Sequence, residues 1–274
     1  MQMNTQREQL IQTWLQAVLQ SDQFEVSFLA GDASFRRYAR IKLNNKSYML
    51  MDAPPEKEDC APFVSIDEFF DQHGVRVPHI VAKDLGLGFL LLEDFGDVVL
   101  STLLNDETVD QYYAQSFKQL IELQQVDGRD HLPAYSYEKL MSEMRLLTDW
   151  MLPSLNIQAT EQQLETIEQA FDFLTMEALN QPQVIVHRDF HSRNLMQIEN
   201  ETALGVIDFQ DAVIGADTYD LISITRDAYV QWNADRVYQW FEVFYDLLPN
   251  AAKENRSYEQ FKRDADLMAI QRHI

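Results

Sequence analysis

Two short apolar runs, each followed by polar residues, constrain the fold of this chain more than any other feature. The run Val184–Val186 leads into the loop His187–Asn194, and the run Leu204–Ile207 ends at Asp208. Short apolar runs bounded by polar residues are typical of buried strands. We therefore predict two short strands whose ends bring the polar side chains of the loop close to Asp208.

The polar residues at these strand ends match what phosphoryl transfer requires. Asp189 and Asn194 lie five residues apart on one loop, and Asp208 follows the next strand. A carboxylate has to orient the attacking hydroxyl and accept its proton, while an amide and a second carboxylate hold Mg²⁺ against the phosphates of ATP. The order H-x-D-x-x-x-x-N, then a strand, then Asp is that of kinase catalytic loops. We predict Asp189 as the base, Asn194 and Asp208 as magnesium ligands, and His187 as a catalytic-loop residue that braces the loop by hydrogen bonding.

Two other interpretations of this segment are weaker. Aspartates commonly end strands, so Asp189 and Asp208 could be turn residues without chemistry, but three groups at this spacing rarely arise by accident. His187 and His191 could bind a metal as an i, i+4 pair only on a helix, and the apolar run before them favours a strand.

Residue patterns predict a sheet-rich first third and a helical remainder. A helical period covers 4–20, and the alternation over 35–43 with the turn signal Asn44-Asn45 predicts a β-hairpin that returns over 46–51. A short helix and two further strands are expected at 61–73, 78–83 and 89–93. Later helices are expected at 106–126, 136–150, 160–180, 217–231, 234–247 and 257–272.

This order of elements predicts an α+β, protein-kinase-like fold of two lobes. Residues 1–95 would form a nucleotide-binding lobe on a small antiparallel sheet, and residues 96–274 a mostly helical catalytic and acceptor-binding lobe. The boundary is expected at Asp94–Asp97, directly after a short apolar strand.

The nucleotide side of the predicted site is less regular. Ala30–Phe35 has a single glycine, and residues 34–47 carry five basic side chains and no acidic one. These basic residues either offset the charge of ATP or form a solvated hairpin edge that discourages strand pairing, and the sequence favours neither. The expected nucleotide-binding residues are Gly31, Ser34, Arg36, Arg37, Glu93 and Phe95.

The third strand lacks the lysine that kinases usually place there. Tyr48–Ala53 contains none, so an arginine of the hairpin or the metal would have to neutralise the phosphates. Glu68, on the predicted short helix, is a candidate partner for such a group.

Charge and composition argue against several classes of protein. The chain has 22 Lys and Arg against 44 Asp and Glu, a net charge of −22, whereas nucleic-acid binding needs a basic surface. It has no run of 18 apolar residues, no signal-peptide pattern at its start and a single cysteine, Cys60. We expect a cytoplasmic protein with no membrane, nucleic-acid or protein partner.

Taken together, these motifs resemble the aminoglycoside phosphotransferase-like kinases. The resemblance is carried by the loop His187–Asn194, by Ile207–Asp211 and by Gly215–Leu221. Within that superfamily the chain looks most like the N-acetylmuramate/N-acetylglucosamine anomeric kinases of bacterial cell-wall recycling. That closer likeness rests on Gly31–Tyr38, Met51–Glu56, Leu91–Asp97 and Ile224–Tyr229.

The resemblance implies transfer of the γ-phosphate of ATP to the anomeric hydroxyl of an amino sugar, giving a sugar 1-phosphate. It also implies that the missing lysine is a trait of the subfamily. The relatives continue beyond Ile274, so part of the acceptor-binding lobe is expected to lie outside this sequence.

The acceptor site should offer a positive group, since N-acetylmuramate carries a lactyl carboxylate. Arg193, Arg226 and Arg272 are candidates for that group, and Tyr229 and Trp232 could stack on the sugar ring. The acceptor-binding residues predicted are Arg193, Asp211, Arg226 and Tyr229.

Two other functions stay open at this point. A kinase of the same fold that acts on an aminoglycoside, choline or a similar cation would suit a strongly acidic chain. A nucleotide-binding pseudokinase or scaffold would explain the missing lysine, although such a protein has no chemical need for Asp189, Asn194 and Asp208 together.

Overall fold

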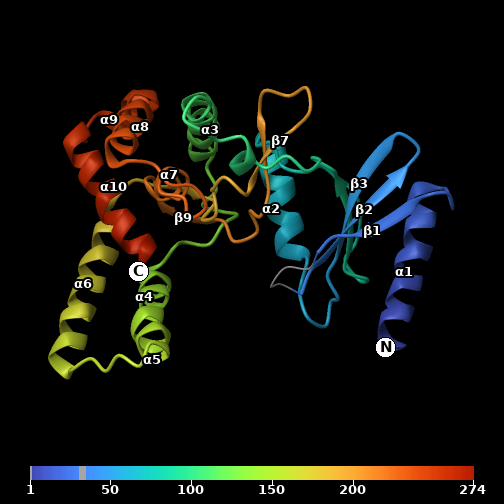
Figure 1. Cartoon of the computed structure of the whole chain (residues 1–274), viewed down its shortest axis with the longest axis horizontal. Helices are drawn as coiled ribbons and strands as arrows, with labels where there is room; N and C mark the ends of the chain where they lie inside the picture. The colour runs from blue at the N-terminus through green and yellow to red at the C-terminus, as the bar shows by residue number, and fades with distance from the viewer. Residues whose placement is uncertain (1, 31–34) are drawn as a thin grey trace. The chain divides into compact units, whose positions relative to one another are not determined.

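The structure, a computed structural model, describes residues 2–30 and 35–274 and contains two compact units, Met1–Gly96 and Asp97–Ile274 (Figure 1). The first unit is rich in strands and the second is mostly helical, as expected for an α+β fold. Gly31 and Ser34, which we expected to bind nucleotide, lie outside the described residues. The assignment of nucleotide binding to residues 1–95 and of catalysis to residues 96–274 stays a prediction.

A five-stranded antiparallel sheet with strand order β1-β2-β3-β5-β4 forms the first unit. The predicted hairpin is confirmed as β2-β3. It turns at Asn44, whose φ of 54° lies in the left-handed region that asparagine tolerates. The strands are β1 (Glu25–Phe28), β2 (Arg37–Leu43), β3 (Lys46–Asp52), β4 (Ile80–Asp84) and β5 (Phe89–Glu93).

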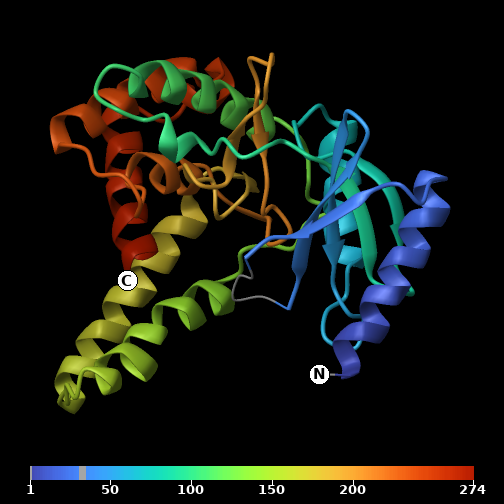
Figure 2. The ribbon, with the colours of Figure 1, turned by 45° about the vertical axis from the view of Figure 1, so that its right-hand side comes forward.

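Helix α1 (Gln2–Leu19) lies along one face of this sheet and α2 (Ala61–Gln72) lies on the other (Figure 2). Ile11 and Leu15 of α1 are buried in one cluster with Ile41 of β2. Alternate residues of a strand face the same side, so Ala39 and Ile41 of β2 meet α1 while Arg40 and Lys42 face away from it.

Asp52, at the end of β3, ties α1 to the sheet. Its carboxylate is fully buried and accepts hydrogen bonds from Nε and Nη2 of Arg7 at 2.9 and 2.7 Å and from Nε of Arg37 at 2.9 Å. Two arginines on one carboxylate compensate a charge that would otherwise be very costly to bury. This ion pair network accounts for an acidic residue at the end of a buried strand.

The second unit consists of helices around two short strand pairs. β6 (Gln183–Val186) pairs with β9 (Val213–Ala216), and β7 (Leu195–Gln197) pairs with β8 (Leu204–Val206), both antiparallel. The longer helices are α3 (Val109–Gln124), α4 (Tyr137–Met144), α6 (Glu161–Asn180), α7 (Tyr219–Thr225), α8 (Ala234–Leu247) and α10 (Tyr258–His273). Shorter helical turns are η1 (Leu100–Thr102), η2 (Leu147–Met151), α5 (Leu152–Ser154) and α9 (Asn250–Lys253).

Two of the expected helices differ from those observed. The helix expected at 217–231 is shorter, because the chain leaves the helical conformation at Arg226 and the side chain of Asp227 binds main-chain N–H groups instead. The helix expected at 136–150 ends at Met144 and is followed by the π-helical turn η2. The strands β7 and β9 were not predicted, since three or four residues are too few for a clear periodic pattern.

A buried group of charges joins α10 to the segment before α7. Arg256 donates to Asp217 at 2.6 Å and to Asp264 at 2.9 Å, and all three side chains are nearly inaccessible to solvent. Asp217 belongs to the stretch Gly215–Leu221 that carries the family resemblance. Its position shows that this part of the motif has a structural role.

None of the helices in the described part of the chain has the length and apolar character that a membrane span requires.

Asp67 on α2 is a buried acid that forms no ion pair with the described residues. Its side chain is only 1% exposed, and Oδ2 has no hydrogen-bond partner among the described residues. Burial, with the nearby charges of Asp71 and Glu68, raises the pKa of Asp67 to about 7. Glu68, which we considered as a partner for a phosphate-neutralising group, instead forms an ion pair with Lys83.

We expect Asp67→Asn to stabilise the protein at pH 8 and to flatten the dependence of stability on pH. The unfolded carboxyl ionises near its ordinary pKa of about 4. Between about pH 4 and pH 7 the folded chain therefore holds more protons than the unfolded chain, and stability falls as the pH rises. Above pH 7 the wild type buries an unpaired charge that asparagine lacks, a difference of about 1–3 kcal/mol.

Urea titrations at pH 5 and pH 8 measure this effect. Asp22→Asn, which changes an exposed acid of the same unit, is the matched control and should leave the difference between the two pH values unchanged. If Asp67→Asn behaves like that control, the ionisation of Asp67 does not limit stability.

Candidate active site

The loop His187–Asn194 joins β6 to β7, and Asp208 follows β8. Because β7 and β8 are antiparallel, the start of one strand lies beside the end of the other. The main-chain N–H of Ile207 donates to the carbonyl of Asn194 at 3.0 Å, and Nδ2 of Asn194 donates to Oδ2 of Asp208 at 3.2 Å. Nδ2 of Asn194 also donates to the main-chain carbonyl of Asp189 at 3.0 Å. The structure thus brings together the three residues that the motif singled out.

The carboxylate of Asp189 is half-buried, and no described residue forms a hydrogen bond with it. Burial, and to a smaller extent the negative charge of Asp208, raises the pKa of Asp189 above the ordinary value. A carboxylate with a raised pKa accepts a proton more readily than an ordinary one. The geometry therefore leaves this side chain available to a hydroxyl of a bound molecule.

Asp208 lies in a strained conformation that directs its carboxylate toward Asn194. Its φ of 66° falls in the left-handed region, which is unfavourable for a residue with a side chain. Oδ1 accepts from Nε2 of Gln210 at 2.9 Å, while Oδ2 meets Asn194. Strain of this kind commonly occurs at functional sites.

The oxygen atoms of Asn194 and Asp208 suit a hard cation such as magnesium. Mg²⁺ prefers carboxylate, carbonyl and water oxygens, and it usually takes one or two protein ligands and completes its shell with phosphates and water. Over the described residues, no group of three or more His, Cys, Asp or Glu side chains has the arrangement of a metal site. A two-ligand site shared with phosphates needs no such group.

Asp220 in the first turn of α7 holds the start of the loop. Its buried carboxylate accepts from the main-chain N–H groups of His187 at 2.6 Å and Arg188 at 3.0 Å. Arg188 has a φ of 75°, in the left-handed region, and these two hydrogen bonds offset the cost of that conformation. Burial raises the pKa of Asp220 to about 7, against the effect of the N–H groups.

Asp227, directly after α7, holds the middle of the loop. Oδ2 accepts from the main-chain N–H of Ser192 at 2.8 Å, and Oδ1 accepts from that of Tyr229 at 2.8 Å. The carbonyl of Ser192 in turn accepts from the N–H of Ser101 at 2.9 Å. The loop is therefore fixed through its main chain on both sides of Asp189.

The ring of His187 does not brace the loop as we expected. The ring is fully buried and packs edge-on against Phe190, with the centroids 6.0 Å apart, and neither ring nitrogen has a hydrogen-bond partner among the described residues. Burial lowers the pKa of His187 to about 4, so the ring is neutral near pH 7. The bracing hydrogen bond comes from the main-chain N–H, because Asp220 reaches the backbone and not the ring.

Arg188 is neutralised within the second unit. Nη2 donates to Glu143 of α4 at 2.7 Å, and the guanidinium lies 5.3 Å from the ring centre of Tyr135. The hydroxyl of Tyr135 also donates to Glu143. This contact holds the residue before Asp189 on its other side.

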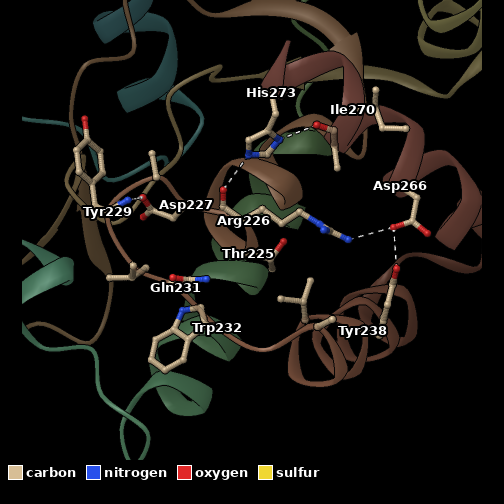
Figure 3. A pocket seen from close by; sticks show the side chains of 15 residues that line it. Thr225, Arg226, Asp227, Tyr229, Gln231, Trp232, Tyr238, Asp266, Ile270 and His273 are labelled. Atoms are coloured by element: carbon tan, nitrogen blue, oxygen red, sulfur yellow. Dashed lines mark hydrogen bonds and ion pairs between the residues drawn. The ribbon is translucent and has the colours of Figure 1, made fainter.

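A pocket of about 920 Å³ lies between the segment after α7, the start of α8 and the end of α10 (Figure 3). Arg226 and Tyr229, two of the residues expected to bind the acceptor, line it. Arg226 donates to Asp266 at 3.1 Å and is therefore neutralised in the pocket wall. Arg193 does not line the pocket but contacts Tyr229, which does. Its guanidinium lies 3.8 Å from the centre of that ring. Asp211 is exposed and does not line the pocket.

Three arginines of the basic stretch 34–47 pair with carboxylates of the first unit that lie outside that stretch. Arg36 pairs with Glu58, Arg37 with the buried Asp52, and Arg40 with Asp94 at 2.6 Å. These acids lie outside residues 34–47, so the composition of that stretch did not reveal them. The two interpretations left open above, charges directed at ATP and a solvated edge, both omit these ion pairs.

Glu93 and Phe95, also expected to bind nucleotide, both contact Arg76. Arg76 donates to the two oxygens of Glu93 at 2.6 and 2.7 Å, and its guanidinium lies 4.6 Å from the ring centre of Phe95. The hydrogen bond from Arg76 lowers the pKa of Glu93. The nucleotide-binding role of Arg36, Arg37, Glu93 and Phe95 stays a prediction.

Sequence reasoning missed Asp220, Asp227 and Glu143 as residues that position the loop. Asp220 and Asp227 do fall within the stretches 215–221 and 224–229 that carry the family resemblance, and this was the signal that could have found them. Glu143 lies in an ordinary amphipathic helix, and nothing in the sequence distinguishes it from the other acids of such helices.

We expect Asp220→Asn to loosen the loop His187–Asn194. The asparagine side chain can accept one of the two hydrogen bonds, but its NH₂ group then faces the other main-chain N–H. The loss of a hydrogen bond to a buried charged acceptor should cost about 1–3 kcal/mol of stability and speed amide hydrogen exchange at His187 and Arg188.

Hydrogen exchange followed by mass spectrometry of peptides from this loop measures the effect. Asp246→Asn, at an exposed position of α8, is the control. Unchanged protection of the two amides in Asp220→Asn would show that the loop does not depend on this carboxylate.

Comparison with protein families gives one match over most of the chain. The model of the phosphotransferase enzyme family (APH) matches residues 25–254. A protein of Pseudomonas aeruginosa named N-acetylmuramate/N-acetylglucosamine kinase is 39% identical over 251 residues, which cover 89% of this chain and 72% of that protein. A protein of Neisseria meningitidis with the same name is 34% identical over 276 residues, covering 98% of this chain and 81% of that protein.

Solved structures share the fold at low identity. A choline kinase from Cryptosporidium parvum has a TM-score of 0.69 at 12% identity, covering 97% of this chain and 87% of that one. An aminoglycoside-3'-phosphotransferase of type VIII has a TM-score of 0.61 at 13% identity, covering 94% and 97%. At these identities the likeness shows the fold alone, and it confirms the expected protein-kinase-like α+β fold.

The catalytic motif, the fold and the extent of these matches agree, and the chain belongs to the phosphotransferase enzyme family.

Proposed function

We propose that this phosphotransferase transfers the γ-phosphate of ATP to the anomeric hydroxyl of N-acetylmuramate or N-acetylglucosamine. The observation that carries the proposal is the arrangement of Asp189, Asn194 and Asp208 at adjoining strand ends. It occurs in a chain that is 34–39% identical to proteins named as kinases of these two sugars. The products would be the sugar 1-phosphate and ADP.

Asp189 would act as the base in this reaction. Its carboxylate has no hydrogen bond from the described residues and has a raised pKa, so it can accept the proton of the anomeric hydroxyl. The sugar oxygen then bonds to the γ-phosphorus, and the bond from that phosphorus to the bridging oxygen breaks as ADP leaves. The hydrogen bonds of Asp220 and Asp227 to the loop would keep Asp189 in place during this step.

Asn194 and Asp208 would hold magnesium at the phosphates. Both offer oxygen atoms, and the pair leaves most of a six-ligand shell to phosphate and water, which is usual for Mg²⁺. The bound ion would supply positive charge that offsets the phosphates. On the nucleotide side, Gly31, Ser34, Arg36, Arg37, Glu93 and Phe95 remain the proposed contacts.

The pocket lined by Arg226, Tyr229 and Trp232 is the proposed place of the acceptor. Its volume of about 920 Å³ is within the usual range for small-molecule sites, and it has both aromatic rings and polar groups. Asp227 lines the pocket and accepts from the N–H of Ser192, so the pocket adjoins the loop that carries the predicted base. Arg193, which stacks on Tyr229, would contact the sugar. Asp211, three residues after Asp208, would be a further contact to it.

The aminoglycoside and choline kinases among the solved structures are 11–17% identical to this chain and show the fold alone. Aminoglycoside and choline acceptors therefore do not form a second candidate function. A cytoplasmic location stays a prediction.

The first test measures ADP release from Mg·ATP with N-acetylmuramate, N-acetylglucosamine and kanamycin. We expect turnover on the two acetylated sugars. In Asp189→Asn, ATP binding should persist while turnover falls by roughly 10²–10⁴, the usual contribution of a positioned general base. The exposed variant Asp246→Asn should match the wild type.

Turnover on kanamycin alone would refute the proposed acceptor and keep the mechanism. Unchanged turnover in Asp189→Asn would refute the assignment of the base.

A second test addresses the metal. Asp208→Ala should abolish Mg²⁺-dependent binding of ATP, because one of the two protein ligands is lost and the ion then no longer offsets the negative charge of the phosphates. Titration of ATP with and without Mg²⁺, in this variant and in Asp246→Ala, measures it. Tight binding of Mg·ATP by Asp208→Ala would argue against a metal role for Asp208.

A further inference from the structure

Among the described residues, the arginines of Asp97–Ile274 differ in their partners. Two of them, Arg193 and Arg272, have no carboxylate within ion-pair distance. In a chain with twice as many acids as bases, an arginine without such a partner is notable. The arginines that do pair with a carboxylate are Arg129, Arg145, Arg188, Arg226, Arg236, Arg256 and Arg263.

Arg272, on the last turn of α10, has two side-chain contacts although it lacks a carboxylate partner. Its Nε donates to Oγ of Ser223 at 2.8 Å, and its guanidinium lies 5.4 Å from the ring centre of Tyr219. The side chain is half-buried. These contacts use Nε and one face of the group, and no hydrogen bond from its two Nη atoms to the described residues occurs.

The anchor of Arg272 places it next to the catalytic loop. Oγ of Ser223 also lies 3.3 Å from the main-chain carbonyl of Arg188, the residue before Asp189. One hydroxyl therefore separates the Arg272 guanidinium from the backbone beside the predicted base. The positive charge of Arg272 also acts on the carboxylates of Asp189 and Asp220. Arg193, by contrast, is exposed and stacks on Tyr229.

A fixed guanidinium with two unused Nη groups is suited to a carboxylate. Its planar donors match the two oxygens of that group, which gives strong and directional hydrogen bonds. The two sugars of the proposed function share the anomeric hydroxyl, but only N-acetylmuramate has a carboxylate, on the lactyl group at carbon 3. A group that recognises this carboxylate has to lie near the base, and the hydroxyl of Ser223 links Arg272 to the residue before Asp189.

We propose that Arg272, which does not line the pocket of Arg226 and Tyr229 but lies beside the catalytic loop, binds the lactyl carboxylate of N-acetylmuramate and so determines the preference between the two acceptor sugars. The inference rests on the proposed function and adds a specificity-determining residue to it. Arg226, which sequence reasoning offered for this role, is neutralised by Asp266 and is the poorer choice for an anion.

The test compares kcat/KM for both sugars in the wild type, Arg272→Gln, Arg272→Lys and Arg263→Gln. We expect Arg272→Gln to lose about 10- to 100-fold with N-acetylmuramate relative to N-acetylglucosamine, the range for hydrogen bonds to a charged group. The preference of Arg272→Lys for N-acetylmuramate should lie between those of the wild type and Arg272→Gln, because lysine keeps the charge and loses the planar pair of donors. Arg263→Gln, on the same helix with a half-exposed side chain, should match the wild type.

A change in the substrate tests the same contact, first in the wild type and then in Arg272→Gln. Esterifying the lactyl carboxylate should lower kcat/KM of the wild type and should have little further effect in Arg272→Gln. If the ester costs the wild type nothing, or costs both proteins the same, Arg272 does not read the carboxylate.

Other outcomes overturn the inference in distinguishable ways. Equal losses on both sugars, with a higher KM for ATP, would place the phosphate and not the acceptor at Arg272. Wild-type turnover on N-acetylglucosamine but not on N-acetylmuramate would refute the inference and keep the sugar-kinase function. Absence of turnover on either sugar would refute the proposed function, and the inference with it.

Discussion

The conformation of the loop His187–Asn194 depends on buried carboxylates that accept hydrogen bonds from its main chain. Asp220 binds the N–H groups of His187 and Arg188, and Asp227 binds that of Ser192. An unpaired N–H group in a buried position costs as much as a lost hydrogen bond, and Arg188 adds the cost of a left-handed conformation. With the backbone held in this way, the carboxylate of Asp189 needs no partner of its own and stays available for chemistry.

The acidic character of the chain is offset locally. Buried acids meet arginines, as Asp52 does with Arg7 and Arg37, or main-chain N–H groups, as Asp220 does. Each buried charge is thereby compensated, which is the condition for keeping it in the interior. Asp67 is an exception among the described residues, since it forms no ion pair with them, and burial raises its pKa. The net charge of −22 therefore describes the surface more than the surroundings of the predicted base.

Much of the fold and part of the candidate site could be predicted because their signals are local. Asp189 and Asn194 share one loop, and Asp208 directly follows the next predicted strand. This spacing alone indicated that the three side chains lie close together. The positioning residues carry no such signal, since Asp220 lies 33 residues from the N–H of His187 that it binds and Glu143 lies 45 residues from Arg188. The ion pairs of the basic stretch 34–47 were not foreseen for the same reason, because their acids lie outside that stretch.

The sequence by itself determined which groups can do chemistry and in what order the elements follow, since both are written in residue types at short spacing. Only the tertiary structure decided which charges neutralise one another. It paired Arg188 with Glu143 and Arg226 with Asp266, and it left Arg272 beside the catalytic loop without a carboxylate. The physical reason is that ion pairs and hydrogen bonds act over a few ångströms in space, whereas a sequence pattern records distance along the chain.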